Sequence, residues 1–186
     1  MIKYLVNRAA DTMRRRYNYD ATYLREVADV SGGGALRIGL LLPMLSGYRA
    51  GCPVDLWAGA AIASTREGDC GPCLQLVIDM AIESGANPDG LRTALQGDPA
   101  AAGDTGLGFR FALAAINDDE NLEELRSEIR RKFSDRALVS LSITAATGRT
   151  WPVIKRGLGH GHLCQSVRID QKPVNLVHVE AGAASG

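Results

Sequence analysis

The stretch Gly68-Asp69-Cys70-Gly71-Pro72-Cys73-Leu74-Gln75-Leu76-Val77 holds two of the chain's four cysteines, at the entrance to an apolar run. Asp69 is predicted to cap the start of a helix, because its carboxylate can accept the free N–H groups of a first turn. Pro72 fits that first turn, where its missing N–H costs nothing. The apolar run is too long for a strand, and Gly85 is a natural helix end. The sequence therefore predicts a buried helix with both thiols in or beside its first turn.

The spacing of these two cysteines favours redox chemistry. A helix N-terminus carries roughly half a positive charge, which favours a thiolate over a thiol. Cys70 and Cys73 are three residues apart, so their sulfurs can come within disulfide range with little movement of the backbone. This arrangement suits a dithiol that attacks a peroxide or a disulfide and then closes on its neighbour.

Three other interpretations of the cysteine pair stay open. A structural zinc site needs four ligands, and the only other cluster of suitable residues is His160, His162 and Cys164. Cys-Gly-Pro-Cys matches the thioredoxin motif, but thioredoxin needs a strand before it, whereas residues 55–65 are Ala-rich and predicted to be helical. The third interpretation is that both cysteines are simply small buried residues at a helix start.

The composition limits the class of protein. The chain has 186 residues with 21 basic and 21 acidic side chains, so nothing indicates binding to nucleic acid or to an anionic membrane. No apolar run is long enough to span a membrane, and charges follow the N-terminal residues too soon for a signal peptide. We expect a cytoplasmic protein with no cofactor. In that reducing location, cysteines are more often reactive or buried than structurally bridged.

The pattern along the chain predicts an all-α domain, residues 1–160, followed by an extended or hairpin C-terminal arm and tail, residues 161–186. The glycine run 32–34 is expected to break a helix, and residues 97–106 to form a loop of small residues. In the last helix, Val153, Ile154 and Leu158 are expected to face inward. Helices are predicted over residues 2–17, 20–30, 35–48, 53–68, 74–82, 88–95, 107–116, 120–133, 138–146 and 150–158.

The chain resembles the alkylhydroperoxidase-D-like, carboxymuconolactone-decarboxylase-like superfamily. The resemblance rests on three places: the helix that leads into the CxxC over residues 55–82, the short helix after Gly85-Ala86, and the section 119–159 with its Pro-Val-Ile-Lys-Arg-Gly-Leu-Gly end. These places cover less than half of the chain directly. The resemblance implies an all-α, oligomeric protein that reduces hydroperoxides through its dithiol and is then reduced again by a dithiol carrier.

The resemblance also assigns roles by position. Cys73 matches the cysteine that the peroxide oxidises to a sulfenic acid, and Cys70 matches its proton-donating and resolving partner. Two positions depart from the family peroxidases, because Val77 replaces a histidine and Ala58 replaces a glutamate. The decarboxylase members lack the CxxC, so the lactone reaction is not expected.

Three carboxylates are candidates for the missing proton relay. Asp55 lies one helical turn before Ala58 on the same face, and Glu67 and Asp69 are close to the cysteines in sequence. Each also has a structural interpretation, as a helix-start residue, a solvent-exposed charge and a helix cap respectively. We therefore treat Asp55, Glu67 and Asp69 as candidate site residues beside Cys70 and Cys73.

The sequence thus predicts an antioxidant, thiol-dependent peroxidase or disulfide oxidoreductase. Its partners would be a hydroperoxide or disulfide substrate and a dithiol reductant. The alternative is a non-catalytic redox sensor or scaffold of the same fold, and a third possibility is a metal-binding module. Ala- and Gly-rich apolar helices with no net charge also predict a homo-oligomer, either a dimer or a higher assembly.

Overall fold

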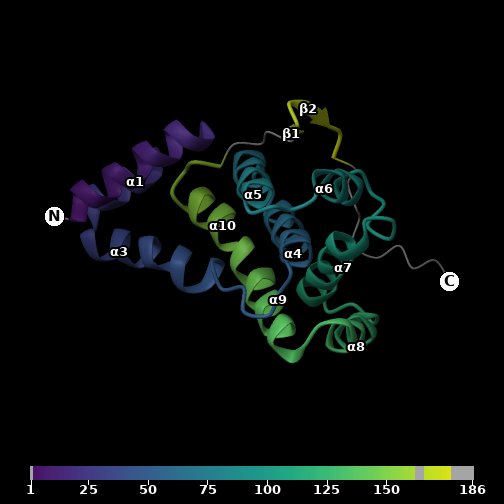
Figure 1. Ribbon diagram of the computed structural model, residues 1–186. Helices are drawn as coiled ribbons and strands as arrows, with labels where there is room; N and C mark the ends of the chain where they lie inside the picture. Colours follow the sequence, from purple (N-terminus) through teal and green to yellow (C-terminus); the bar gives the residue numbers. More distant parts are fainter. Residues whose placement is uncertain (1, 162–165, 177–186) are drawn as a thin grey trace.

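The computed structural model describes residues 2–161 and 166–176. These residues form an all-α fold with a short two-stranded hairpin, as the sequence predicts (Figure 1). The elements are α1 (Ile2–Tyr17), α2 (Thr22–Val30), α3 (Gly32–Leu41), the π-helical turn η1 (Leu42–Ser46), α4 (Val54–Glu67), α5 (Gly71–Glu83), α6 (Pro88–Leu95), α7 (Gly103–Asn117), α8 (Leu122–Lys132), α9 (Asp135–Gly148), α10 (Thr150–Gly157), β1 (Val167–Ile169) and β2 (Lys172–Val174).

The centre of the molecule is helix α4, which is buried from Leu56 to Thr65. It packs most extensively against α7, and then against α9 and α5. Small residues allow this contact: a Cβ at Gly59 would lie 1.8 Å from the carbonyl oxygen of Thr105, and one at Gly108 would lie 1.9 Å from that of Leu56. The Gly positions of α4 and α7 therefore let the two backbones approach each other closely.

Helix α5 follows α4 after a short turn, and its start differs from the prediction. The N-cap is Cys70, whose sulfur accepts a hydrogen bond from the backbone N–H of Cys73. Asp69 is one residue too early to cap and has a left-handed backbone, with φ 53°. The other predicted signals hold, because Pro72 lies in the first turn and Gly85, with φ 93°, follows the helix end.

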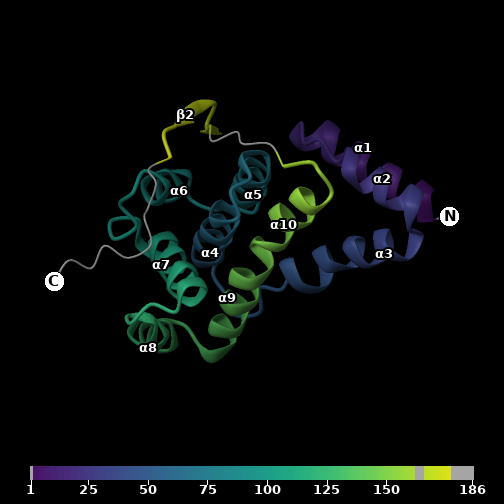
Figure 2. The same cartoon turned by 180° about the vertical axis from the view of Figure 1, so that it is seen from behind.

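Helices α1, α2 and α3 lie together on one side of the molecule, next to α9 and α10 (Figures 1 and 2). The predicted break after Val30 is present, but it is shorter than expected: only Ser31 separates α2 from α3, and the glycine run 32–34 forms the first turn of α3. The loop predicted over residues 97–106 is also too long, since α7 begins at Gly103. Helix α9 is capped by Ser134, whose hydroxyl accepts the backbone N–H of Ala137.

The C-terminal hairpin packs onto the helical body. Strands β1 and β2 pair antiparallel, with Val167 opposite Val174. Both residues and Ile169 are buried in the main hydrophobic core. Thus the change from helix to hairpin expected near residue 160 is present, but the two parts share one core. The rest of the predicted arm, residues 177–186, lies outside the described residues.

The structure also bears on the membrane question. Within residues 2–161 and 166–176, no helix combines the length and the apolar character needed to cross a bilayer.

Candidate redox site

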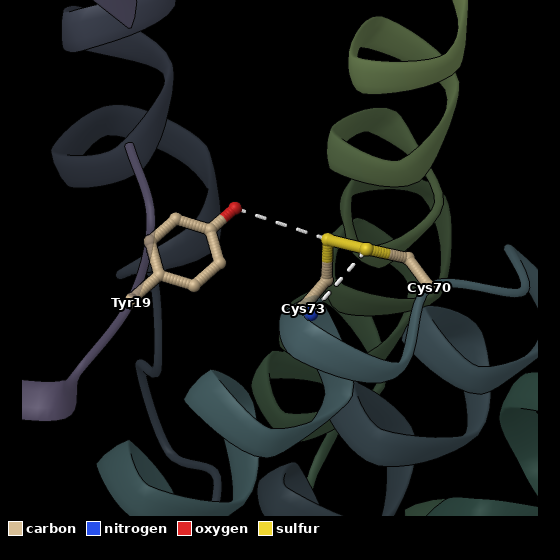
Figure 3. The surroundings of a disulfide bond; sticks show 3 residues. All are labelled: Tyr19, Cys70 and Cys73. Atoms are coloured by element: carbon tan, nitrogen blue, oxygen red, sulfur yellow. Dashed lines mark hydrogen bonds between the residues drawn. A yellow bond between two sulfur atoms is a disulfide. The ribbon is translucent and has the colours of Figure 1, made fainter. Parts of the chain in front are cut away.

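The two cysteines of the CxxC motif form a disulfide at the start of α5 (Figure 3). Their sulfurs are bonded and their Cα atoms are 5.2 Å apart. The motif can close because Cys70 is extended at the N-cap position while Cys73 already belongs to the first turn. The predicted proximity of the two sulfurs is therefore confirmed.

The start of α5 also supplies electrostatic support for a thiolate. The Sγ atom of Cys70 accepts the backbone N–H of Cys73 at 3.3 Å, in the position that a serine or aspartate oxygen normally takes in a capped helix. Free N–H groups and the helix dipole at this end lower the pKa of a nearby thiol. Both side chains are buried, with 8% of Cys70 and 3% of Cys73 exposed, and this burial opposes the effect of the helix end, because it disfavours a charged sulfur.

A cavity of about 230 Å³ lies between the N-terminal helices and the helical body, and Cys73 is part of its wall. Cys70 is not among the residues that line it. The walls come from α1, α2, α3, η1, α4, α5, α9 and α10 and the loops beside them, and most of the lining side chains are apolar. They include Met13, Leu24, Ile38, Ala61, Leu76, Val77, Met80 and Trp151. A molecule in this cavity would meet the sulfur of Cys73 first.

Tyr19, from the loop between α1 and α2, points its hydroxyl at the sulfur of Cys73 (Figure 3). The oxygen lies 3.9 Å from Sγ, and the tyrosine also lines the cavity. Only 5% of Tyr19 is exposed, and this burial, followed by the influence of Tyr23, raises the pKa of its hydroxyl. Tyr19 therefore remains a protonated hydrogen-bond donor at any physiological pH.

Lys155 of α10 is buried behind this tyrosine. Its ammonium lies 4.9 Å from the centre of the Tyr19 ring and 5.5 Å from that of Tyr23. Burial lowers the pKa of Lys155. The sequence pattern had placed Val153 and Leu158 inward, but both are exposed, and the chain buries Lys155 and Pro152 instead. No apolar periodicity could identify a buried lysine, and Tyr19 in a short loop carries no sequence signal either.

The three candidate carboxylates do not line the cavity. Asp55 accepts the backbone N–H of Asn87 at 2.7 Å, and Glu67 forms an ion pair with Arg149 at 2.9 Å. Asp69 precedes the disulfide and is exposed. Asp55 lies in the first turn of α4 and Glu67 is an exposed charge, as their structural interpretations expected, whereas Asp69 does not cap α5.

Val77 and Ala58, where the sequence departs from the peroxidases of the family that it resembles, lie in different parts of the structure. Val77 lies one turn after Cys73 and lines the cavity, so it offers an apolar surface where the family peroxidases have a histidine. Ala58 is completely buried in the core of α4 and is not part of the cavity wall. The hydroxyl of Tyr19, rather than a histidine at position 77, is the polar group beside the sulfur of Cys73.

Metal ligation was the competing interpretation of the cysteines. Among the described residues, no group of three or more His, Cys, Asp or Glu side chains could hold a metal ion. His160 is instead paired with Glu26 at 2.6 Å. His162 and Cys164 lie outside the described residues.

The chain matches no protein-family model, no curated protein and no solved structure, so its function must be inferred from the geometry of the site.

Proposed function

We propose that the protein is a thiol-dependent peroxidase or disulfide oxidoreductase in which Cys73 is the attacking thiol and Cys70 the resolving one. One observation carries the proposal: Cys73 lines the apolar cavity, whereas Cys70 is turned away from it and bonded to Cys73. A substrate in the cavity therefore reaches Cys73, and the partner sulfur is already within bonding range. The roles agree with those implied by the resemblance to alkylhydroperoxidase-D-like proteins.

In the first step the Cys73 thiolate attacks the terminal oxygen of a hydroperoxide, ROOH. The S–O bond forms as the O–O bond breaks, so Cys73 becomes a sulfenic acid and the leaving alkoxide takes up a proton to give ROH. The hydroxyl of Tyr19 lies on the cavity side of the sulfur and donates a hydrogen bond first to the thiolate and then to the departing oxygen.

In the second step the thiol of Cys70 attacks the sulfenic sulfur of Cys73. The new S–S bond displaces hydroxide, which leaves as water with the proton of Cys70. An external dithiol then reduces the disulfide by exchange and becomes a disulfide itself, so the two electrons that reduced the peroxide come from that carrier. Because Val77 offers no base beside Cys73, turnover is expected to be slow.

The test is mass spectrometry of the reduced protein after one equivalent of tert-butyl hydroperoxide. Wild type should lose two hydrogens as the internal disulfide. Cys70→Ser should gain one oxygen, trapped as a sulfenic acid on Cys73. Cys52 is the internal control, because burial raises the pKa of its thiol to about 11 and leaves it protonated at neutral pH.

Two results would contradict the proposal. If Cys73→Ser traps the sulfenic acid on Cys70, the two roles are reversed. If neither motif thiol reacts faster than Cys52 or Cys164, the site has no redox function.

The alternative is a redox sensor of the same fold, whose dithiol is oxidised once and is not recycled. The burial of both sulfurs favours it, because a protein dithiol needs access to one of them. The two functions differ in turnover: with excess hydroperoxide and dithiothreitol, a peroxidase consumes many equivalents of peroxide per protein, whereas a sensor consumes about one.

A further inference from the structure

Three residues that line the cavity each carry a buried side-chain N or O atom without a hydrogen-bond partner: Ser46, Trp57 and Thr65. These atoms have almost no accessible surface, so a molecule in the cavity does not reach them in this arrangement. The chemistry of a ligand is therefore set by the charged side chain in the cavity wall.

The cavity also contains a guanidinium group. Arg49 lines it and is stacked over the ring of Trp57, with its central carbon 3.4 Å from the ring centroid. The ion pairs formed within residues 2–161 and 166–176 do not involve Arg49. Stacking uses the face of the guanidinium and leaves the N–H groups in its plane free to bind an anion.

Arg49 marks one end of the cavity, because it is stacked on Trp57 in the first turn of α4. Thr65 lies eight residues after Trp57 along the same helix, or about 12 Å. The short link from α4 to α5 brings Cys73 to the Thr65 end. Between the two ends the lining is mainly apolar, with Met13, Leu76 and Val77 among it.

From this arrangement we infer that the cavity binds a medium-chain carboxylate, with its carboxylate group on Arg49 and its hydrocarbon chain directed toward Cys73. One guanidinium balances one negative charge, which matches a carboxylate rather than a phosphate dianion. An apolar cavity of ~150 Å³ holds a benzene-sized molecule. The larger volume here, about 230 Å³, therefore suits a short chain with a head group.

Binding of the carboxylate does not depend on the thiols. That such a ligand, carrying a hydroperoxide, is the substrate of Cys73 rests on the proposed function.

The experiment is isothermal titration calorimetry of the full-length, oxidised protein with octanoate and with 1-octanol. Octanoate should bind at least tenfold more tightly than the alcohol, because hydrogen bonds to charged groups are stronger than those to neutral ones. Arg49→Gln should weaken octanoate binding about tenfold and leave octanol binding within a factor of three. Arg37→Gln is the matched control: this arginine of α3 is exposed, does not line the cavity and should leave both affinities unchanged.

Equal binding of octanoate and octanol, or an unchanged octanoate affinity in Arg49→Gln, would overturn the inference. Cys73→Ser separates it from the proposed function, since this variant should still bind octanoate although it cannot react with peroxide. If octanoate binds but the thiols fail the peroxide test, the carboxylate site is supported and the proposed redox function is contradicted. If the thiols react but octanoate does not bind, the redox function is supported and the carboxylate site is contradicted.

Discussion

If Cys73 is the attacking thiol, as proposed, Tyr19 is the side chain expected to affect its reactivity most directly. Its hydroxyl is the donor 3.9 Å from the sulfur, and burial keeps it protonated. A hydrogen bond to a thiolate stabilises the charged form and lowers the thiol pKa. The sequence identified the two cysteines but no such donor, because the contact joins a loop and a helix that are 54 residues apart.

Removing this hydroxyl should make Cys73 less reactive. In the Cys70→Ser background, Tyr19→Phe is expected to raise the pKa of Cys73 and to slow its alkylation at pH 7 about tenfold. The measurement is the rate of reaction with iodoacetamide as a function of pH. Tyr4→Phe is the control, because this tyrosine of α1 is exposed and does not line the cavity. An unchanged pH profile in Tyr19→Phe would exclude this role.

At the scale of the elements, the contact between α4 and α7 holds the core together. The two backbones approach so closely at Gly59 that a Cβ there would lie 1.8 Å from the carbonyl oxygen of Thr105. Sequence periodicity predicted both helices and the apolar character of each. It could not predict which helix would lie against α4, since Ala- and Gly-rich faces are compatible with several neighbours.

An added methyl group at this crossing should push the two helices apart. Gly59→Ala is expected to lower the free energy of unfolding by about 2 kcal/mol or more, because overpacking costs typically ~1–3 kcal/mol and backbone is harder to displace than a side chain. Urea denaturation of the variant and the wild type measures this change in the free energy of unfolding. Gly157→Ala is the matched control at the end of α10, where no atom lies within 4 Å, and it should be neutral or slightly stabilising. Equal stability of the two variants would show that the crossing tolerates a methyl group.

Helix α3 shows how packing overrides local preference. Each glycine costs about 1 kcal/mol relative to alanine in a helix, which is why the run Gly32–Gly34 predicted a break. Within α3, Ala35 is buried, and the helix packs against both α1 and α2. The hydrophobic contact outweighs the glycine penalty, and the helix begins at Gly32.

At the scale of the whole molecule, the C-terminal hairpin completes the core. Ile169 is fully buried, and the backbone of Arg168 is held by Gln75 of α5, which donates to its carbonyl at 3.0 Å and accepts its N–H at 2.7 Å. The hairpin thus contacts the helix that carries the disulfide. Its loss would expose apolar surface of the body.

Truncating the buried side chain of Ile169 tests whether the hairpin contributes to the stability of the core. Ile169→Ala should lower the free energy of unfolding by about 2–4 kcal/mol, the usual range for a large apolar side chain removed from a core. Arg168→Ala is the control, because its side chain is exposed and only its backbone bonds to Gln75. Both are measured by thermal unfolding followed by circular dichroism. A small change in Ile169→Ala would mean that the hairpin only rests on the surface.

The predicted homo-oligomer remains a prediction at this scale. Large apolar side chains are exposed on the N-terminal helices, on η1 and on the residues after η1. In a homo-oligomer, a second copy of the chain would cover this surface. The exposed side chains are Tyr4, Leu5, Val30, Leu36, Leu40, Met44, Leu45 and Tyr48.

The amino-acid pattern was sufficient for the helical class, for most helix positions and for the pairing of Cys70 with Cys73. These depend on neighbours within one or two turns, where capping, proline and glycine signals and apolar periodicity act directly. The donor beside Cys73, the buried Lys155, the carboxylate-binding end at Arg49 and the cavity itself depend on residues from separate helices. Their contacts form only when the helices pack, and packing is decided by shape and burial over the whole chain rather than by local preference.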